Sequence, residues 1–368
     1  MTDLIGELRA RRLVRELDPV RRLGAGRPTR PIDFDGEPWC VFGVHIDVDR
    51  VDVAASTVGG RELWTEYSHP DLRGAGESGY RTIADVLTKQ LGRIPADKQL
   101  IAIEIAVPGH VAMDRGTVRG ADGLGWHDFG LGSAVLATLS EAGIEQASVG
   151  VSNVSQLAAL YASRIELPVG PDGIAVYLGG VRRLGSGVVT RGEIFRGTNG
   201  GAGDFAHLNR EPTGPTCWCG RNGCLESLAG PPALLSQLSP MSLDEARNLV
   251  EDQPEKAIQL MIEAAESGEP AVSEALDQAG DVLGGAIDDI IGAVNPDVVL
   301  LGGYLGLLSR HLLPSVEKRL SQRLALATYE RTEVRGLDQL SARAVNGATL
   351  AARDACFYDP LALTRPVS

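Results

Sequence analysis

Four residues with metal-binding side chains, His207, Cys217, Cys219 and Cys224, lie within the run GDFAHLNREPTGPTCWCGRNGCLE. One imidazole and three thiols suit Zn²⁺, which prefers nitrogen and sulfur ligands in a tetrahedron. Four protein ligands leave no coordination position for water, so the predicted zinc is structural and braces a loop. Pro and Gly between the ligands favour a knuckle-like turn. The alternative is a chance cluster of buried or disulfide-forming cysteines, and we favour zinc.

The other two cysteines, Cys40 and Cys356, stand in apolar surroundings and are predicted to be buried thiols. The chain begins MTDLIGELRARR, which is charged from the start and unlike a signal peptide. The sequence contains no stretch of 18 consecutive apolar residues, so no membrane span is predicted. We therefore expect a cytoplasmic protein in a reducing compartment, without a membrane partner.

Charge is distributed unevenly along the chain. The net charge of −13 argues against a nucleic-acid-coating surface over most of the molecule. Residues 1–30 contain eight Arg and four acids, a net charge of +4, so the remainder carries −17. A basic N-terminal segment on an otherwise acidic chain indicates a nucleic-acid contact. The alternative is that this segment is a solvated basic helix and tail.

The pattern of apolar residues predicts an α/β protein of at least two domains, because 368 residues exceed one typical core. Apolar residues recur at helical spacing in many segments, and short apolar or alternating runs mark strands. Helices are expected over 3–17, 81–95, 133–142, 156–165, most of 232–292 and 341–356. Strands are expected over 39–58, 60–69, 101–109, 147–153, 173–181 and 186–197, with a strand–glycine turn–helix over 295–306. Two such halves suggest two related lobes around a cleft.

Four stretches of the sequence resemble the ROK family, which is named for repressors, open reading frames and sugar kinases. They are VPGHVAMDRGTVRGADGLGW, VSNVSQLAAL, the cysteine run ending GCLE, and VVLLGGYLG. The resemblance covers nearly the whole chain. It implies a two-lobed actin-like, hexokinase-type (ribonuclease H-like) ATPase fold with a zinc knuckle and a sugar site. It also implies a homodimer or homotetramer. The lobes are expected at 37–153, completed by the helix within 341–360, and at 154–340.

Both phosphate loops of the family's kinases are altered in this sequence. The first, D-x-G-G-T in the family, falls on residues 45–49, where Asp47, Val48 and Asp49 replace the glycines and threonine. A carboxylate beside a triphosphate repels it by about 4 kcal/mol per charge pair at 4 Å before screening. The second, G-x-G-I-G, falls on Val181-Arg182-Arg183-Leu184-Gly185, where the bulky side chains of Val181 and Arg183 replace glycines. These changes argue against ATP as a cofactor.

The position of the family's catalytic base is also changed. Family kinases carry an Asn-Asp pair whose Asp takes the proton from the sugar hydroxyl, and here the pair is Asn153-Val154. Valine accepts no proton, and a general base commonly supplies about 10²–10⁴-fold in rate. We therefore assign no catalytic residue. Gly302 and Gly303 match the family's adenosine-side turn as a nucleotide-site remnant, or form an ordinary strand–helix turn.

The sugar-binding positions implied by the resemblance are partly retained. They fall on Gly123, Asn153, Asp204, His207 and Glu226. Gly123 supplies no side chain, and Asp204 is one methylene shorter than the family's Glu. Asn153, Asp204, His207 and Glu226 are the candidate ligand-binding residues for a carbohydrate-like molecule. The alternative is that they are structural remnants.

The N-terminal segment, residues 1–36, resembles the end of the winged helix-turn-helix that family repressors carry. ELRARRLVREL would be its last helix and GAGRPTRPIDF a basic wing, in which Arg27 and Arg30 are the candidate DNA contacts. Such a wing grips phosphate or the minor groove and carries little sequence information. The preceding helices are missing, so we expect either an upstream start codon or a shortened relative.

We therefore favour a ROK-type transcriptional regulator, in which a catalytically inactive sugar-kinase body senses a carbohydrate or derivative and controls DNA binding. The first alternative is an ATP-dependent sugar kinase of glucokinase or N-acetylhexosamine kinase type, in which Asp204 or Asp122 replaces the base. The second is a pseudokinase sensor that acts through protein contacts without DNA.

Overall fold

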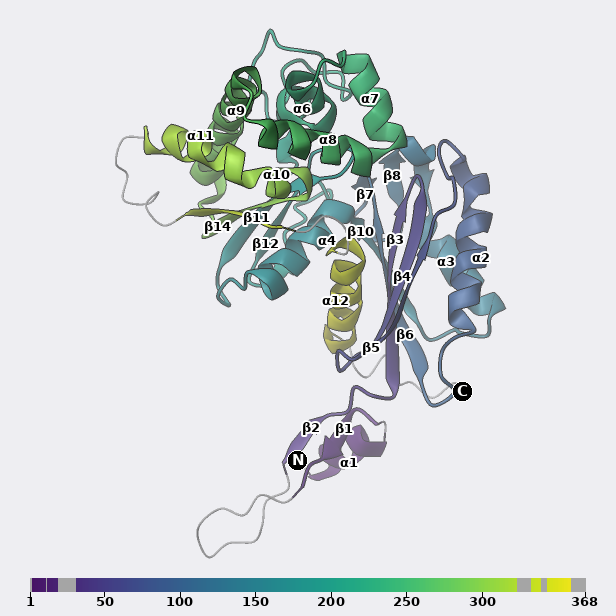
Figure 1. Cartoon of the computed structure of the whole chain (residues 1–368). Helices are drawn as coiled ribbons and strands as arrows, with labels where there is room; N and C mark the ends of the chain where they lie inside the picture. The colour runs from purple at the N-terminus through teal and green to yellow at the C-terminus, as the bar shows by residue number, and fades with distance from the viewer. Residues whose placement is uncertain (1, 11, 19–30, 323–331, 339–342, 359–368) are drawn as a thin grey trace, which may run out of the picture. The chain divides into compact units, whose positions relative to one another are not determined.

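The computed structural model describes residues 2–10, 12–18, 31–322, 332–338 and 343–358 (Figure 1). They form two compact units. Unit 1 contains the described residues up to Val154 and from Val345 onward, and unit 2 contains those from Ser155 to Ala344. The domain boundaries expected from the sequence, including a separate module over residues 1–36, stay predictions.

Unit 1 is built on a five-stranded sheet in the order β10-β6-β3-β4-β5. Its strands are β3 (Trp39–Asp47), β4 (Arg50–Thr57), β5 (Glu62–Ser68), β6 (Gln99–Val107) and β10 (Ser148–Asn153). Antiparallel pairing joins β3, β4 and β5, whereas β6 runs parallel to both β3 and β10. A smaller sheet contains β7 (His110–Val111), β8 (Val118–Ala121) and β9 (Trp126–Phe129).

Helices cover both faces of this sheet (Figure 1). On one face, α2 (Tyr80–Leu91) and α3 (Leu131–Glu141) bury Ile83, Leu87 and Val135 in a common apolar cluster with the strands. On the other face lies α12 (Arg343–Tyr358), whose Ala352 and Cys356 pack with residues of β3. Cys40 and Cys356 are both buried, as the sequence predicts, and burial raises the pKa of each thiol to about 12.

Unit 2 contains a second five-stranded sheet in the order β13-β12-β11-β14-β15. Its strands are β11 (Ile174–Gly180), β12 (Gly185–Thr190), β13 (Glu193–Ile194), β14 (Val298–Gly302) and β15 (Glu333–Gly336). The hairpin of β11 and β12 and the strand–turn–helix of β14 and α10 (Gly303–Leu307) are both as predicted. The sheet therefore combines an antiparallel hairpin with parallel strands.

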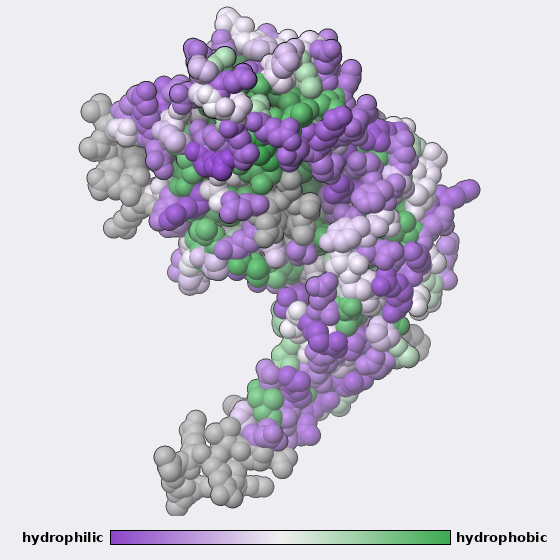
Figure 2. Space-filling model, viewed as in Figure 1, coloured by the Kyte–Doolittle hydropathy of each residue, from purple (hydrophilic) through white to green (hydrophobic). Residues whose placement is uncertain are grey.

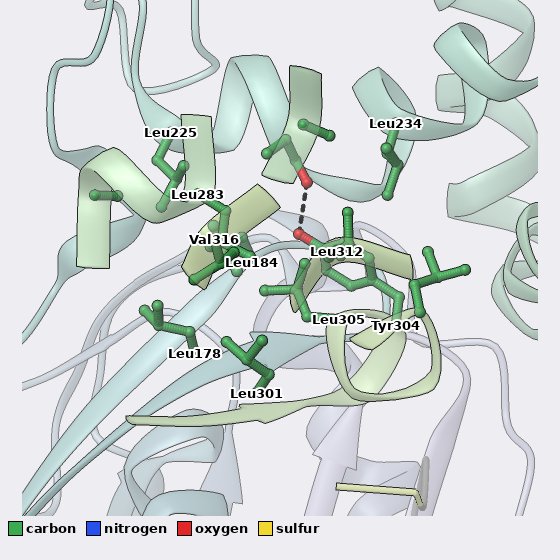
Figure 3. Packing of buried hydrophobic residues seen from close by; sticks show 14 of the residues in the cluster. Leu178, Leu184, Leu225, Leu234, Leu283, Leu301, Tyr304, Leu305, Leu312 and Val316 are labelled. Atoms are coloured by element: carbon green, nitrogen blue, oxygen red, sulfur yellow. Dashed lines mark hydrogen bonds between the residues drawn. The ribbon is translucent and has the colours of Figure 1, made fainter. Parts of the chain in front are cut away.

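A helical layer covers one face of this second sheet (Figure 1). It contains α5 (Leu225–Ala229), α6 (Pro231–Leu238), α7 (Leu243–Asp252), α8 (Pro254–Ser267), α9 (Pro270–Val294) and α11 (Ser309–Ser321). Figure 3 shows the apolar cluster beneath these helices, where the Tyr304 hydroxyl donates a 2.7 Å hydrogen bond to the Ala229 carbonyl. Helix α4 (Val154–Tyr161) continues as a π-helical turn, Ala162–Glu166. A side chain on Gly187 of β12 would meet Gln156 and Ala159 of this helix.

The helix expected over residues 3–17 is wrong beyond its first half. Helix α1 spans Thr2–Ala10, and Val14–Glu16 form strand β1 instead, paired antiparallel with β2 (Ile32–Phe34). The reason is tertiary. Arg12 turns the backbone at φ 58°, its carbonyl accepts a hydrogen bond from the Trp39 indole, and Leu13 is buried against Trp39. Packing thus ends the helix at Ala10, although apolar residues continue at helical spacing as far as Leu17.

Polar residues cover most of the face seen in Figure 2, in keeping with the acidic composition. Among the described residues, no helix is long and apolar enough to cross a membrane.

Candidate metal centre and ligand site

The four predicted metal ligands are brought together in unit 2. The ligand atoms of His207, Cys217, Cys219 and Cys224 all lie within 4.8 Å of one another. Cys219 Sγ is 3.6 Å from Cys224 Sγ, and Cys217 Sγ is 3.6 Å from His207 Nδ1. All three cysteines are free thiols, so the disulfide alternative is wrong.

These separations fit a tetrahedral zinc site. With Zn–S near 2.3 Å and Zn–N near 2.05 Å, a regular tetrahedron places sulfurs about 3.8 Å apart and nitrogen about 3.6 Å from sulfur. The two measured separations match this geometry closely. His207 Nδ1 and the three sulfurs would hold the ion, and its chemistry there is structural, because no coordination position remains for a substrate.

The loop between the ligands is shaped by its own backbone. Cys217 N–H donates to the Arg221 carbonyl at 2.7 Å, and Gly223 N–H donates to the Pro215 carbonyl at 2.8 Å. Gly223 has φ 63°, and a Cβ there would lie 1.6 Å from the Glu211 carbonyl oxygen. The sequence therefore folds into a tight double turn that presents the thiols to a common point.

Burial and hydrogen bonding set the protonation of the ligands. Burial lowers the pKa of His207, although Asp204 opposes this, so the imidazole is in the neutral form that binds metals. Burial raises the pKa of Cys217 to about 12. At Cys219 burial acts in the same direction, but hydrogen bonds from the backbone and side chain of Arg221 outweigh it and lower the pKa to about 7.

Glu226, directly after the cysteine run, is buried in the first turn of α5. Its Oε2 accepts a 2.6 Å hydrogen bond from the Leu184 backbone N–H. Burial raises the pKa of this carboxyl to about 7, against the lowering effects of that hydrogen bond and of Arg183. The carboxylate therefore occupies one of the backbone donors that a phosphate loop would offer to a nucleotide.

The second phosphate-loop segment is integrated into the protein. The Leu184 side chain is 5% exposed and belongs to the apolar cluster shown in Figure 3. Arg182 is also buried, and its Nε donates to the Glu251 carbonyl in the last turn of α7 at 3.2 Å. Arg183 lies 3.6 Å from the Glu251 carboxylate. Both arginines thus bind the carboxyl-terminal end of α7, where cations are favourable.

The first phosphate-loop segment is a two-residue turn between β3 and β4, since Asp47 pairs with Arg50. Val48, in the turn, is buried, and a Cβ on Gly123 would lie only 2.9 Å from its Cγ1. The Val48 N–H donates to Asp47 Oδ1 at 2.8 Å. The valine thus fills space next to the position where the family carries its sugar-binding Asn.

The candidate ligand residues are divided between the two units. Asn153 ends β10 in unit 1, and its amide donates to the Gly109 carbonyl at 2.7 Å. The other three lie in unit 2, where Asp204 is exposed and near enough to raise the pKa values of both His207 and Glu226. Val154 begins α4 and is half-buried.

The glycine pair 302–303 has a structural explanation. Gly303 has φ 55°, and a Cβ there would lie 2.0 Å from the Gly180 carbonyl oxygen. The two backbones form an isolated parallel bridge at this point. The ordinary strand–helix turn thus accounts for Gly303 without a nucleotide.

The candidate DNA contacts Arg27 and Arg30 lie outside the described residues. They belong to the connection between β1 and β2, whose ends are joined by a 2.8 Å hydrogen bond from Leu17 N–H to the Pro31 carbonyl. Of the nearby arginines, Arg9 is bonded to Glu16 and Arg15 to Asp33.

Sequence reasoning missed the interactions of Arg182 and Arg183 with α7, and the exposed Trp218 beside His207. The indole is 57% exposed, and its ring centroid is 4.9 Å from that of His207. The residue types on the loop were visible in the sequence, but their partners lie far along the chain.

Similar proteins include both regulators and kinases. The chain is 24% identical over 326 residues to the xylose repressor of Caldicellulosiruptor bescii, covering 88% of this chain and 79% of the repressor. It is 28% identical over 288 residues to the glucokinase of Halalkalibacterium halodurans, covering 76% of this chain and 84% of the kinase.

Solved structures establish the fold. A ROK family transcriptional regulator homologous to the E. coli MLC protein superposes with a TM-score of 0.80 at 22% identity, covering 99% of this chain and 91% of that one. A ROK family glucokinase from Streptomyces griseus superposes with a TM-score of 0.66 at 21% identity, covering 86% and 99%. The predicted hexokinase-type α/β fold is confirmed. The sequence profile of the ROK family matches residues 77–355, and the chain therefore belongs to the ROK family.

Proposed function

We propose that this chain is a transcriptional regulator whose kinase-like body binds a carbohydrate or derivative without phosphorylating it. The single observation that carries the proposal is the half-buried Val154 after Asn153, at the position of the family's catalytic base. Loss of a general base removes about 10²–10⁴-fold of rate. The proposal includes a cytoplasmic location, a structural zinc and a homo-oligomer.

The altered phosphate loops support the absence of kinase activity. Leu184 uses its N–H for Glu226 and buries its side chain, so it cannot both stay in the core and cradle a phosphate. Asp49 adds negative charge at the first loop, although Arg50 and Arg73 lie within 4.0 Å of it. A bound triphosphate would have to compete for these cations.

The proposed ligand residues are Asn153, Asp204, His207 and Glu226. If Nδ1 of His207 faces the metal, Nε2 remains for a ligand hydroxyl. Carboxylate, amide and imidazole groups together form the hydrogen-bonding set that vicinal hydroxyls require. Both the repressor and the kinase relatives are named for sugars or their use, which supports a carbohydrate.

For DNA, the proposal rests on the α1–β1–β2 arrangement, a helix followed by an antiparallel hairpin. Arg27 belongs to the Gly-Arg-Pro run of the wing-like segment and Arg30 follows it, so we assign the phosphate contacts to them. Backbone contacts of this kind position a protein on DNA.

An electrophoretic mobility shift assay of the zinc-loaded chain on DNA from upstream of its own gene tests the proposal. We expect binding that weakens with salt, and each arginine–phosphate interaction that is removed should reduce the salt slope by about 0.9. Arg27→Gln and Arg30→Gln should each reduce the slope, whereas the matched control Arg119→Gln, an exposed arginine of β8, should not. Absence of salt-sensitive binding to any such DNA rejects the DNA-binding function.

The similarity to a glucokinase keeps a second candidate, a sugar kinase with an atypical base, Asp204 or Asp122. A coupled ATP-turnover assay with hexoses and N-acetylhexosamines decides this. Turnover that is abolished by Asp204→Asn establishes the kinase and overturns the regulator proposal. If the chain binds a sugar but neither turns over ATP nor binds DNA, the result indicates a sensor that acts through protein contacts.

A further inference from the structure

A cavity of about 400 Å³ lies within unit 2, beside the cysteine loop. Its walls come from that loop, from α5, α6 and α7, and from Arg183. The space is within the range of small-molecule sites. Two lining residues fall on binding positions of the family, Glu226 on a sugar position and Arg183 on the second phosphate loop.

Most of the cavity wall is apolar, and it is supplied by the cysteine loop and by helices. Pro215 and Trp218 line it from the cysteine loop, Pro232 from α6, and Leu243 from α7. Trp218 lies between two metal ligands, so a metal-braced loop presents its largely exposed ring. An exposed indole on a fixed loop offers a flat apolar face at low entropic cost.

Two cations complete the lining. Arg183 and Arg247 both line the cavity, and each side chain is 51% exposed. Arg183 also lies over the Trp218 ring, with its guanidinium carbon 5.8 Å from the centroid. The partner of Arg247 is Asp244, which is 87% exposed, and such an exposed ion pair is readily exchanged.

Acidic groups lie beside both cations, since Glu226 belongs to the lining and the Glu251 carboxylate is 3.6 Å from Arg183. A bound carboxylate therefore has to displace Glu251 and Asp244 from the guanidinium groups. Glu226 directs Oε2 to the Leu184 N–H and is buried. The lining thus offers two guanidinium groups and an aromatic face.

We propose that this cavity binds a small aromatic carboxylate, with the ring against Trp218 and Leu243 and the carboxylate on Arg183 and Arg247. Planar guanidinium groups bind carboxylates through paired, charge-assisted hydrogen bonds. This site shares Glu226 with the proposed carbohydrate site, and the proposal does not depend on the proposed regulatory function.

Isothermal titration of the zinc-loaded full chain with cinnamate and with cinnamamide tests the proposal, since the two differ in charge but hardly in shape. We expect one cinnamate site per chain and binding of cinnamamide weaker by about tenfold or more, the value of a charged hydrogen bond. Arg247→Gln should weaken the binding of cinnamate by a similar factor and leave the affinity for cinnamamide unchanged. Arg310→Gln, an exposed arginine on α11, is the matched control and should change neither.

Fluorescence locates the site. Cinnamate should quench the exposed Trp218, and Trp218→Phe should abolish most of the quenching while titration still detects binding. Equal affinity for cinnamate and cinnamamide, or cinnamate binding insensitive to both Arg247→Gln and Trp218→Ala, overturns the proposal. Absence of binding by the folded, zinc-loaded protein does so as well.

Discussion

Removal of the metal should lower the free energy of unfolding of unit 2, and the size of this change can be calculated. The ligands His207 and Cys224 close a segment of 18 residues. In the chain-entropy treatment of a cross-link, closing a loop of this length stabilises the folded state by about 3 kcal/mol at 25 °C. Hydrogen bonds such as Cys217 N–H to the Arg221 carbonyl remain after removal, so we expect a loosened unit rather than an unfolded one.

This free energy converts to a melting temperature. Unit 2 spans Ser155 to Ala344, and for 150–250 residues each kcal/mol shifts the melting temperature by about 2–4 °C. Chelation should therefore lower the melting temperature by about 6–12 °C. Differential scanning calorimetry measures the shift, mass spectrometry of the metal confirms its removal, and added Zn²⁺ should restore the transition.

Variants provide the controls. His207→Ala should lower metal affinity, reduce thermal stability and weaken any ligand response. Cys356→Ala removes a buried thiol outside the cluster and should leave the zinc content unchanged. An unchanged melting temperature after verified loss of zinc would refute the assignment of a structural, loop-bracing metal.

Three further changes test the packing and the altered kinase site. Leu184→Ala, at a buried position of the second phosphate-loop segment, should cost about 2–5 kcal/mol in urea unfolding because a buried leucine leaves a cavity; a cost below about 1 kcal/mol would show that Leu184 is not a core residue. Ser242→Ala removes the capping box of α7 and should cost about 1 kcal/mol, whereas Ser242→Gly should cost only a few tenths; equal costs would contradict the cap. Val154→Asp should produce no ATP-dependent sugar phosphorylation in a coupled assay, since both phosphate loops remain altered; measurable turnover would show that the missing base was the only defect.

Much of the candidate site was predictable because its signals are local. The four metal ligands fall in one short run, and their residue types alone indicate zinc. Alternating apolar residues predicted the β11–β12 hairpin. The strand expected over residues 39–58 is instead divided by a turn into the antiparallel strands β3 and β4. The proposed loss of the catalytic base likewise depends on residue identity, because the residue after Asn153 is Val154.

Only the tertiary structure decided what the altered residues do. In the sequence Arg183 indicates a broken phosphate loop, but the structure places it 3.6 Å from the Glu251 carboxylate. The neighbouring Leu184 N–H donates to Glu226, 42 residues away, and the Leu184 side chain joins the core. Val48 indicates a missing glycine, but it packs next to Gly123. The apolar periodicity of residues 3–17 favours one helix, yet packing of Leu13 on Trp39 ends it early. In each case burial depends on residues distant in the chain, and such packing overrides local pattern when it removes apolar surface from water.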